Sequence, residues 1–213
     1  MQNNNSPGRG EVEVGNQVPM PLASSLTARY LIDSGISRFT VRAFATGLLS
    51  AIGHNPTIAI NDFKGQVRVG SDSLEGASLR MAIKADSLTV QNQISDKDRR
   101  EMEKKMMKEV LETDRFPEIV YECTDVSGSY GVAGPSLVVL NGNLTLHGIT
   151  RNLSINTTAS LLGNLLRASG EFSIQQSDYG IRPVSAVGGT IRLKDELKFS
   201  FEVVARKQNN QSL

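Results

Sequence analysis

Tryptophan is absent from this sequence, and aromatic residues of all kinds make up only 5% of its 213 positions. Surfaces that stack nucleic-acid bases depend on aromatic rings, and sugar-binding surfaces usually do as well. The formal net charge is only +1, from 23 basic and 22 acidic residues, so long-range attraction to nucleic acid or anionic lipid is not implied. The composition therefore argues against a nucleic-acid partner.

Cysteine and histidine are also scarce. The single cysteine, Cys123, excludes an intrachain disulfide. It alternates with Ile119 and Tyr121 as in a strand, and a buried, unreactive thiol is the interpretation we favour. The two histidines, His54 and His147, form no zinc-ligand cluster in the sequence. Because GxSxG, HExxH, P-loop and CxxC signatures are missing too, we expect no metal, no other cofactor and no catalytic residue.

Long apolar runs are missing: none approaches the roughly 20 residues that span a bilayer. The first residues lack the apolar core of a secretory signal and carry Glu11 and Glu13. The sequence as it stands predicts a cytoplasmic protein, or a periplasmic one if an upstream signal has been missed. Residues 1–27 are rich in Asn, Gly, Pro and Ser and predict a disordered arm, and residues 207–213 predict a flexible tail. This leaves 28–206 as one domain.

Alternation of apolar and polar residues dominates that domain. Such alternation predicts antiparallel strands with one apolar and one polar face. We expect a mainly β protein, a single antiparallel barrel, with turns at Lys64-Gly65, Gly148 and Asp195-Glu196 and a single helical turn over 47–53. The expected strands cover residues 30–33, 37–45, 56–62, 66–69, 77–85, 118–124, 138–146, 152–158, 167–176, 187–193 and 197–204.

One helix, at about 95–112, interrupts the strands. Ser95 and Asp98 have the spacing of a capping box at its start, and Phe116-Pro117 is expected to end it. Its charged face is typical of a solvated surface, and flexible thioethers suit a lid over a variable apolar ligand. The expected apolar stripe consists of Met102, Met106 and Val110, with Met107 and Leu111 beside it.

A barrel of this kind either fills its interior with side chains or encloses an apolar ligand. Strand parity predicts these cavity-lining residues: Phe39, Val41, Ile58, Ile60, Leu79, Met81, Ile83, Ile119, Tyr121, Phe172 and Ile174. The predicted cavity mouth consists of Phe44, Leu48, Leu49, Ile52 and His54. His54 either contacts a polar head group or satisfies a turn carbonyl, and His147, at a hairpin corner, is expected to be exposed to solvent.

Several motifs, taken together, resemble the YceI-like lipid-binding family. They are YLID at 30–33 with SRFTV at 37–41, TDRFPEI at 113–119, NGNLTLHGITR at 141–151 and SDYGI at 177–181. The resemblance covers about residues 29–205 and implies a long, lipocalin-like barrel whose apolar pocket holds an isoprenoid chain, such as a quinone tail or a polyprenyl phosphate. Relatives often carry an arginine shortly before the Asp-aromatic-Gly turn, where this chain has Gln176.

Three functions follow as hypotheses. The first is non-catalytic binding, storage or transport of a long-chain isoprenoid, a fatty chain or another lipid. The second is an interaction or scaffold module with a filled barrel, which acts through its helix or arm. The third is a lipid-ester hydrolase or isomerase that uses His54 with Asp62 or Asp178. A homodimer is compatible with each of them.

Overall fold

In the computed structural model, the described residues are 27–46, 55–70, 73–129, 134–186 and 191–208. Nearly all of the expected arm and most of the tail lie outside them, as does the expected helical turn at 47–53. The strands, all antiparallel where they pair, are β1 (Ala28–Ile32), β2 (Arg38–Thr46), β3 (Thr57–Ile60), β4 (Phe63–Gly70), β5 (Ser73–Lys84), β6 (Leu88–Val90), β7 (Glu118–Ser129), β8 (Ser136–Leu146), β9 (Ile149–Leu162), β10 (Leu165–Gln175), β11 (Ser185–Ala186) and β12 (Ile191–Lys207).

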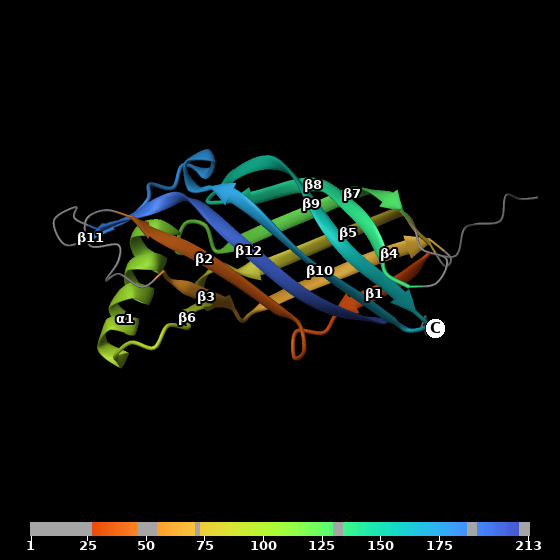
Figure 1. Cartoon of the computed structure of the whole chain (residues 1–213), viewed down its shortest axis with the longest axis horizontal. Helices are drawn as coiled ribbons and strands as arrows, with labels where there is room; N and C mark the ends of the chain where they lie inside the picture. Colours follow the sequence, from red (N-terminus) through yellow and green to blue (C-terminus); the bar gives the residue numbers. More distant parts are fainter. Residues whose placement is uncertain (1–26, 47–54, 71–72, 130–133, 187–190, 209–213) are drawn as a thin grey trace, which may run out of the picture.

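Eight strands close an elongated barrel (Figure 1). They follow the order β1, β4, β5, β7, β8, β9, β10 and β12, and β12 pairs back to β1. The remaining strands extend one end, because β2 continues along β12 beyond β1, β3 pairs with β2 and β6 pairs with β3. The expected mainly β barrel is therefore confirmed.

The first four residues of the strand expected at 187–193 lie outside the described residues. Two differences from the expected strands lie at turn-like dipeptides. Lys64 and Gly65 lie within β4 and pair with β5, so the predicted turn there is wrong. Asp195 and Glu196 lie within β12, where the register with β2 shifts between Leu193 and Leu197. A bulge places an extra residue in a strand without ending it, and turn-forming residue types therefore occur inside a continuous strand.

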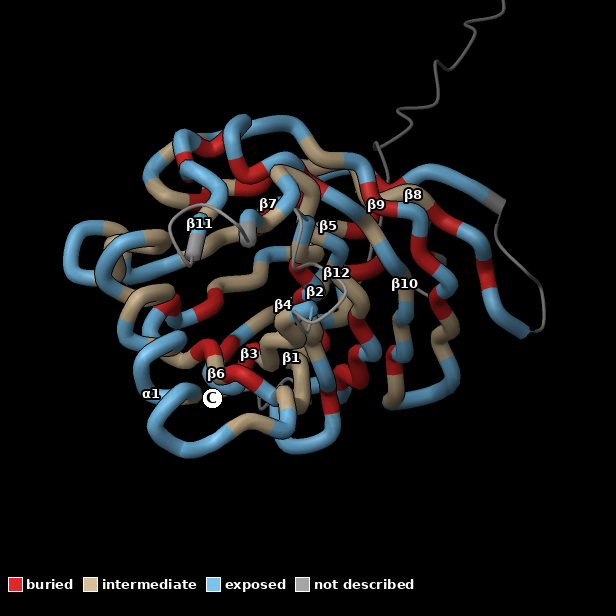
Figure 2. The backbone as a smooth tube through the Cα atoms, turned by 60° about the vertical axis from the view of Figure 1, so that its left-hand side comes forward, coloured by how far each residue is buried: buried red, intermediate tan, exposed pale blue. Residues whose placement is uncertain are grey.

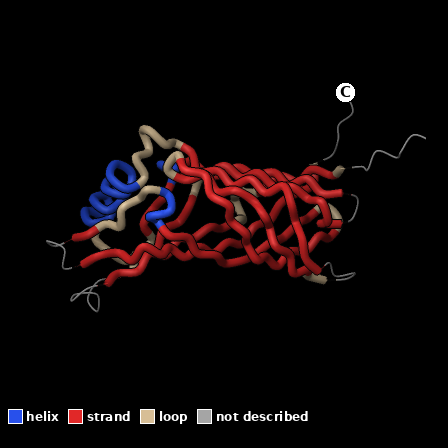
Figure 3. The backbone as a smooth tube through the Cα atoms, turned by 90° about the horizontal axis from the view of Figure 1, so that it is seen from above, coloured by secondary structure: helices blue, strands red, loops and turns tan. Residues whose placement is uncertain are grey.

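The helix α1 (Asp96–Lys105) begins as expected. The Asp98 amide donates to Ser95 Oγ over 3.2 Å, and the Ser95 hydroxyl donates to Asp98 Oδ2 over 2.7 Å. A π-helical turn, η2 (Met106–Val110), follows and ends the helical segment before Phe116-Pro117, because the chain leaves the helix at Glu112 with a left-handed φ of 45°. Both segments lie at the extended end of the barrel (Figure 3).

The two ends of the barrel are packed differently. At the end opposite α1, large side chains from several strands are fully buried, among them Tyr30, Val69 and Cys123. Figure 2 shows such buried residues alternating with exposed ones along the strands. Nearer to α1, a second buried cluster of Val41, Ile60, Phe63, Ile83 and Leu88 has half-buried methionines of η2 packed against it.

Candidate functional site

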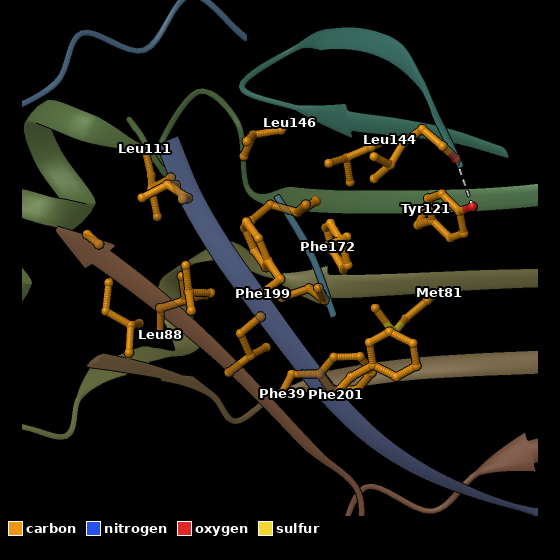
Figure 4. A pocket seen from close by; sticks show the side chains of 18 of the residues that line it. Phe39, Met81, Leu88, Leu111, Tyr121, Leu144, Leu146, Phe172, Phe199 and Phe201 are labelled. Carbon is orange, nitrogen blue, oxygen red and sulfur yellow. Dashed lines mark hydrogen bonds between the residues drawn. The ribbon is translucent and has the colours of Figure 1, made fainter. Parts of the chain in front are cut away.

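A cavity of about 270 Å³ occupies the α1 end and middle of the barrel. Side chains from nearly every barrel strand point into it (Figure 4). Its described lining is apolar except for Tyr121, Lys105 and Gln176. The deeply buried side chains Tyr30, Val69 and Cys123 do not line it. The barrel is thus hollow toward α1 and filled at its opposite end.

Strand parity placed most of the expected residues around one space. Those that line the cavity are Phe39, Val41, Ile58, Ile60, Leu79, Met81, Ile83, Ile119, Tyr121 and Phe172. Ile174 does not line it: the side chain is 6% exposed and packs in the core, next to a separate surface pocket formed with Asp178 and Tyr179. The strand is followed directly by a 3-10 turn, η3 (Gln176–Tyr179), whose Tyr179 lines the same surface pocket as Ile174.

Of the residues expected at the cavity mouth, the structure describes only Phe44. Phe44 does not line the cavity, because it alternates with the inward Val41 and Ala43 and lies on the outer face of β2. There, the cations of Arg42 and Lys198 lie 5.9 and 5.8 Å from its ring centroid. The other expected mouth residues, Leu48, Leu49, Ile52 and His54, lie outside the described residues.

The sequence prediction missed most of one wall of the cavity. This wall comes from β8, β9, β10 and β12, and of these strands only β10 contributed a predicted lining residue, Phe172. The missed residues alternate with polar ones as the predicted residues do. They include Leu140, Leu144, Leu146, Leu153, Ile155, Leu166, Ala168, Leu197, Phe199, Phe201 and Val203.

Aromatic rings form the middle of the cavity lining. Phe172 and Phe199 face each other across β10 and β12 with centroids 4.8 Å apart and planes at 6°. Phe39 contacts Phe63 edge-on at 4.8 Å and stacks on Phe201 at 6.0 Å. Offset and edge-on pairs of this kind hold one another in place, so this part of the wall is preorganised.

Tyr121 contributes a polar group that the protein itself satisfies. Its ring packs over Gly142, where an added Cβ would lie 2.9 Å from Tyr121 Cζ and 2.4 Å from the Glu122 carbonyl oxygen. The hydroxyl lies 2.9 Å from the Leu140 carbonyl oxygen and 3.1 Å from that of Leu153. Burial raises the pKa of this phenol far above its usual value, so it stays neutral at physiological pH.

Helix α1 covers the near end of the cavity without being buried itself. Met102, Met106, Val110 and Leu111 line the cavity, as the predicted stripe requires, but α1 has no buried residue and Met102 is 37% exposed.

Polar side chains attach α1 to the edge strand β6. The Val90 amide donates to Glu103 Oε1 over 2.9 Å, and Arg99 donates to the carbonyl oxygens of Val90 and, over 2.9 Å, Asn92. These contacts satisfy backbone groups that an edge strand would otherwise leave open.

The prediction that His147 is exposed is wrong, because only 13% of its side chain is accessible. His147 and Gly148 both have positive φ (51° and 74°), as a two-residue hairpin requires. This turn directs the imidazole inward against Phe116, with centroids 4.4 Å apart. Nδ1 lies 3.3 Å from the Tyr179 carbonyl oxygen, and Nε2 lies 3.5 Å from Glu112 Oε1.

Cys123 is buried as expected, at 1% exposure, and burial raises the pKa of its thiol. Within the part of the chain that the structure describes, no group of three His, Cys, Asp or Glu side chains is arranged to hold a metal ion. A search of the same residues finds no helix with the length and apolar character needed to cross a membrane.

Comparison with solved structures identifies the same fold in bacterial proteins. BcnA from Burkholderia cenocepacia superposes with a TM-score of 0.62 at 14% identity, covering 81% of this chain and 98% of the other. A polyisoprenoid-binding domain from Saccharophagus degradans, implicated in plant cell wall breakdown, gives 0.61 at 14% identity, covering 84% and 98%. The Campylobacter jejuni YCEI protein gives 0.55 at 14% identity, covering 71% and 85%.

Sequence comparison extends the likeness. A UPF0312 protein of Shewanella baltica is 28% identical over 147 residues, which are 68% of this chain and 69% of that protein. The model of the YceI-like domain matches residues 30–205, which is all but two residues at each end of the span from β1 to β12. The chain therefore belongs to the YceI-like family.

Proposed function

We propose that this protein binds a long-chain isoprenoid or other lipid inside the barrel, without catalysis, for storage or transport. The observation that carries the proposal is the cavity of about 270 Å³, walled by apolar side chains and covered by α1. This volume, about 270 Å³, lies just below the usual range for ligand pockets, roughly 300–1,000 Å³. A filled barrel, the alternative for an interaction module, would have no such space at the α1 end.

The hydrophobic effect supplies the driving force for holding a chain in this space. Each methylene removed from water contributes about 0.8 kcal/mol, so ten of them contribute about 8 kcal/mol. Lost translational and rotational freedom costs at least about 4 kcal/mol. The polyisoprenoid-binding domain of Saccharophagus degradans, which shares this fold, supports an isoprenoid as the chain.

Extraction of natively purified protein with organic solvent, followed by mass spectrometry, tests the proposal. We expect an isoprenoid or fatty chain in stoichiometric amount. Protein that comes out empty and that also fails to take up any added isoprenoid would contradict the proposal.

A charge placed inside the cavity should prevent binding. Met81 lines the cavity and pairs in register with Tyr121, so Met81→Arg would bury a cation that has no partner. We expect roughly a hundredfold loss of affinity for a fluorescent apolar probe.

The matched control is Ala82→Arg, because the next residue of β5 points to the outer face and does not line the cavity. Met81→Gln is a milder variant of the same position. Equal probe binding by folded Met81→Arg and Ala82→Arg proteins would show that this wall does not contact the ligand.

A further inference from the structure

Gln176 is a polar residue in the wall of an otherwise apolar cavity. It follows β10 at the first position of η3, is only 3% exposed and lines the cavity. Phe172 shares its strand parity and lines the same wall. A buried amide in this position needs partners, because buried polar atoms in proteins are nearly always hydrogen-bonded.

One contact fixes the orientation of the Gln176 amide. Its Nε2 donates to the Lys194 carbonyl oxygen over 2.9 Å. A carbonyl oxygen only accepts hydrogen bonds, so the nitrogen and not the oxygen must face Lys194. No donor among the described residues reaches Oε1. The amide therefore presents a free acceptor and, on its second N–H, a donor.

The other polar side chains of the described cavity wall offer less. The Tyr121 hydroxyl gives its single proton to backbone carbonyls and has no donor left for a ligand. Lys105 has 43% of its side chain exposed, and its Nζ lies 3.8 Å from Glu109 Oε2. Its aliphatic stem lines the cavity while its charge remains solvated and paired. Gln176 is therefore the buried, neutral side chain of the described wall that offers both a donor and an acceptor.

This arrangement suits a hydroxyl better than a phosphate. A hydroxyl both donates and accepts, and so complements the two free functions of the Gln176 amide. A phosphate offers only acceptors when it is ionised; it would face the Gln176 oxygen and would lose its hydration without a buried counter-charge.

We propose that Gln176 recognises the hydroxyl head of an alcohol-terminated isoprenoid or fatty chain, in preference to the phosphate ester of the same chain. This inference rests on the proposed function, because it assigns the head group of the chain that the cavity binds.

Three ligands that share one chain test the inference on the wild-type protein. Farnesol, its methyl ether and farnesyl phosphate would compete with a fluorescent apolar probe for delipidated protein. The ether keeps the oxygen acceptor but lacks the donor. Because a site built to hydrogen-bond a hydroxyl discriminates strongly against its absence, we expect farnesol to bind at least roughly tenfold more tightly than either of the others.

A pair of adjacent glutamines supplies matched variants. Gln176→Leu removes the inward amide, and we expect the ratio of farnesol to ether affinity to fall to about one while ether affinity is kept. Gln175→Leu makes the same change at an exposed position and should leave the ratio at its wild-type value. If Gln176→Leu does not fold, the three wild-type affinities still decide whether the cavity prefers the hydroxyl head, and equal affinities would overturn the inference.

The outcomes separate the inference from the proposed function. If ether or phosphate binds as tightly as farnesol, the chain binds but Gln176 does not select its head, and the inference is wrong. A Gln176→Leu protein that keeps the wild-type ratio leads to the same conclusion. If none of the three ligands binds, the proposed function fails as well.

Discussion

Individual inward-facing residues set how much of the barrel remains hollow. Ala168 on β10 lines the cavity and lies opposite Ala159 of β9 and Val203 of β12. Ala159 is buried without lining the cavity, so this position is near the inner limit of the hollow part. A larger side chain here would occupy space that a bound chain would otherwise fill.

Ala168→Leu should therefore shorten the preferred ligand. The three added carbons displace about three methylenes, each worth about 0.8 kcal/mol, so the affinity for the longest chain that the wild type accepts should fall roughly fiftyfold. Shorter chains should bind as before. Competition measurements across a series of isoprenoid alcohols would show the change.

Ser169→Leu adds comparable bulk to the next, exposed position of β10 and should leave chain preference unaltered. An Ala168→Leu protein with the wild-type length preference would place the bound chain elsewhere in the barrel.

The sequence predicts correctly which side chains face inward where the position of a residue along its strand and the polarity of its side chain agree. Val41, Ile60 and Ile83 are apolar at inward positions, and the structure buries them. Gln176 has the same parity as Phe172, but a polar residue argues against an inward position when only the sequence is known. Its orientation depends on a hydrogen bond to the Lys194 carbonyl oxygen. That oxygen lies beside Gln176 only because β12 pairs with β10.

At the scale of elements, α1 is held by side chains rather than by a buried face. Arg99 and Glu103 bond to the backbone at Val90 and Asn92, and α1 itself has no buried residue. Segments with few buried apolar contacts open at low free-energy cost. We therefore expect the helix to open more readily than the barrel strands.

Removing both attachments should accelerate ligand release. Hydrogen bonds to charged groups contribute about 1.5–3 kcal/mol each, so the Arg99→Ala/Glu103→Ala double variant should release a bound chain at least roughly tenfold faster. Global unfolding should change little, because the barrel ladders stay intact. Stopped-flow release of a fluorescent chain and hydrogen exchange of the Val90 amide would measure both effects.

The double variant Arg100→Ala/Glu101→Ala is the control, since it removes the same residue types from exposed positions of α1. If the Val90 amide exchanges faster only in Arg99→Ala/Glu103→Ala but the two double variants release the chain at equal rates, the chain leaves by another route.

Short elements were the least predictable from the sequence. The three-residue strand β6 (Leu88–Val90) was not predicted, because three residues are too few to show a period. Its existence depends on pairing with β3 and on the side chains of α1 that satisfy its open edge. Long strands such as β9 and β10 repeat the alternation often enough to be recognised locally.

At the scale of the whole molecule, one closed barrel of paired strands has a filled half opposite α1 and a hollow half toward α1. The filled half contains Tyr30, Val69 and Cys123, all at most 2% exposed, and can supply stability without any ligand. Alternation in the sequence predicts a barrel in both halves equally. Which half is hollow depends on how side chains from opposite strands meet, and the sequence alone does not show this.

Three buried titratable groups also predict how stability depends on pH. Burial raises the pKa of Cys123, Tyr121 and Tyr179 above their usual values. For a raised pKa, the folded state holds the proton more tightly than the unfolded state does. The stabilisation is complete below the unfolded pKa values, about 8.5 for cysteine and about 10 for tyrosine, and is lost as the pH rises above them.

We therefore expect the free energy of unfolding to be flat near pH 8 and to decrease above about pH 9, by up to about 1.4 kcal/mol per pH unit for each proton released on unfolding. Urea unfolding between pH 7 and 11 would measure the slope. Cys123→Ala removes the group with the lowest ordinary pKa, so its curve should begin to fall at a higher pH than that of the wild type, although the lost volume lowers the whole curve. Coincident onsets in the two proteins would mean that Cys123 ionises equally readily in both states, and so would contradict its burial in the filled half of the barrel.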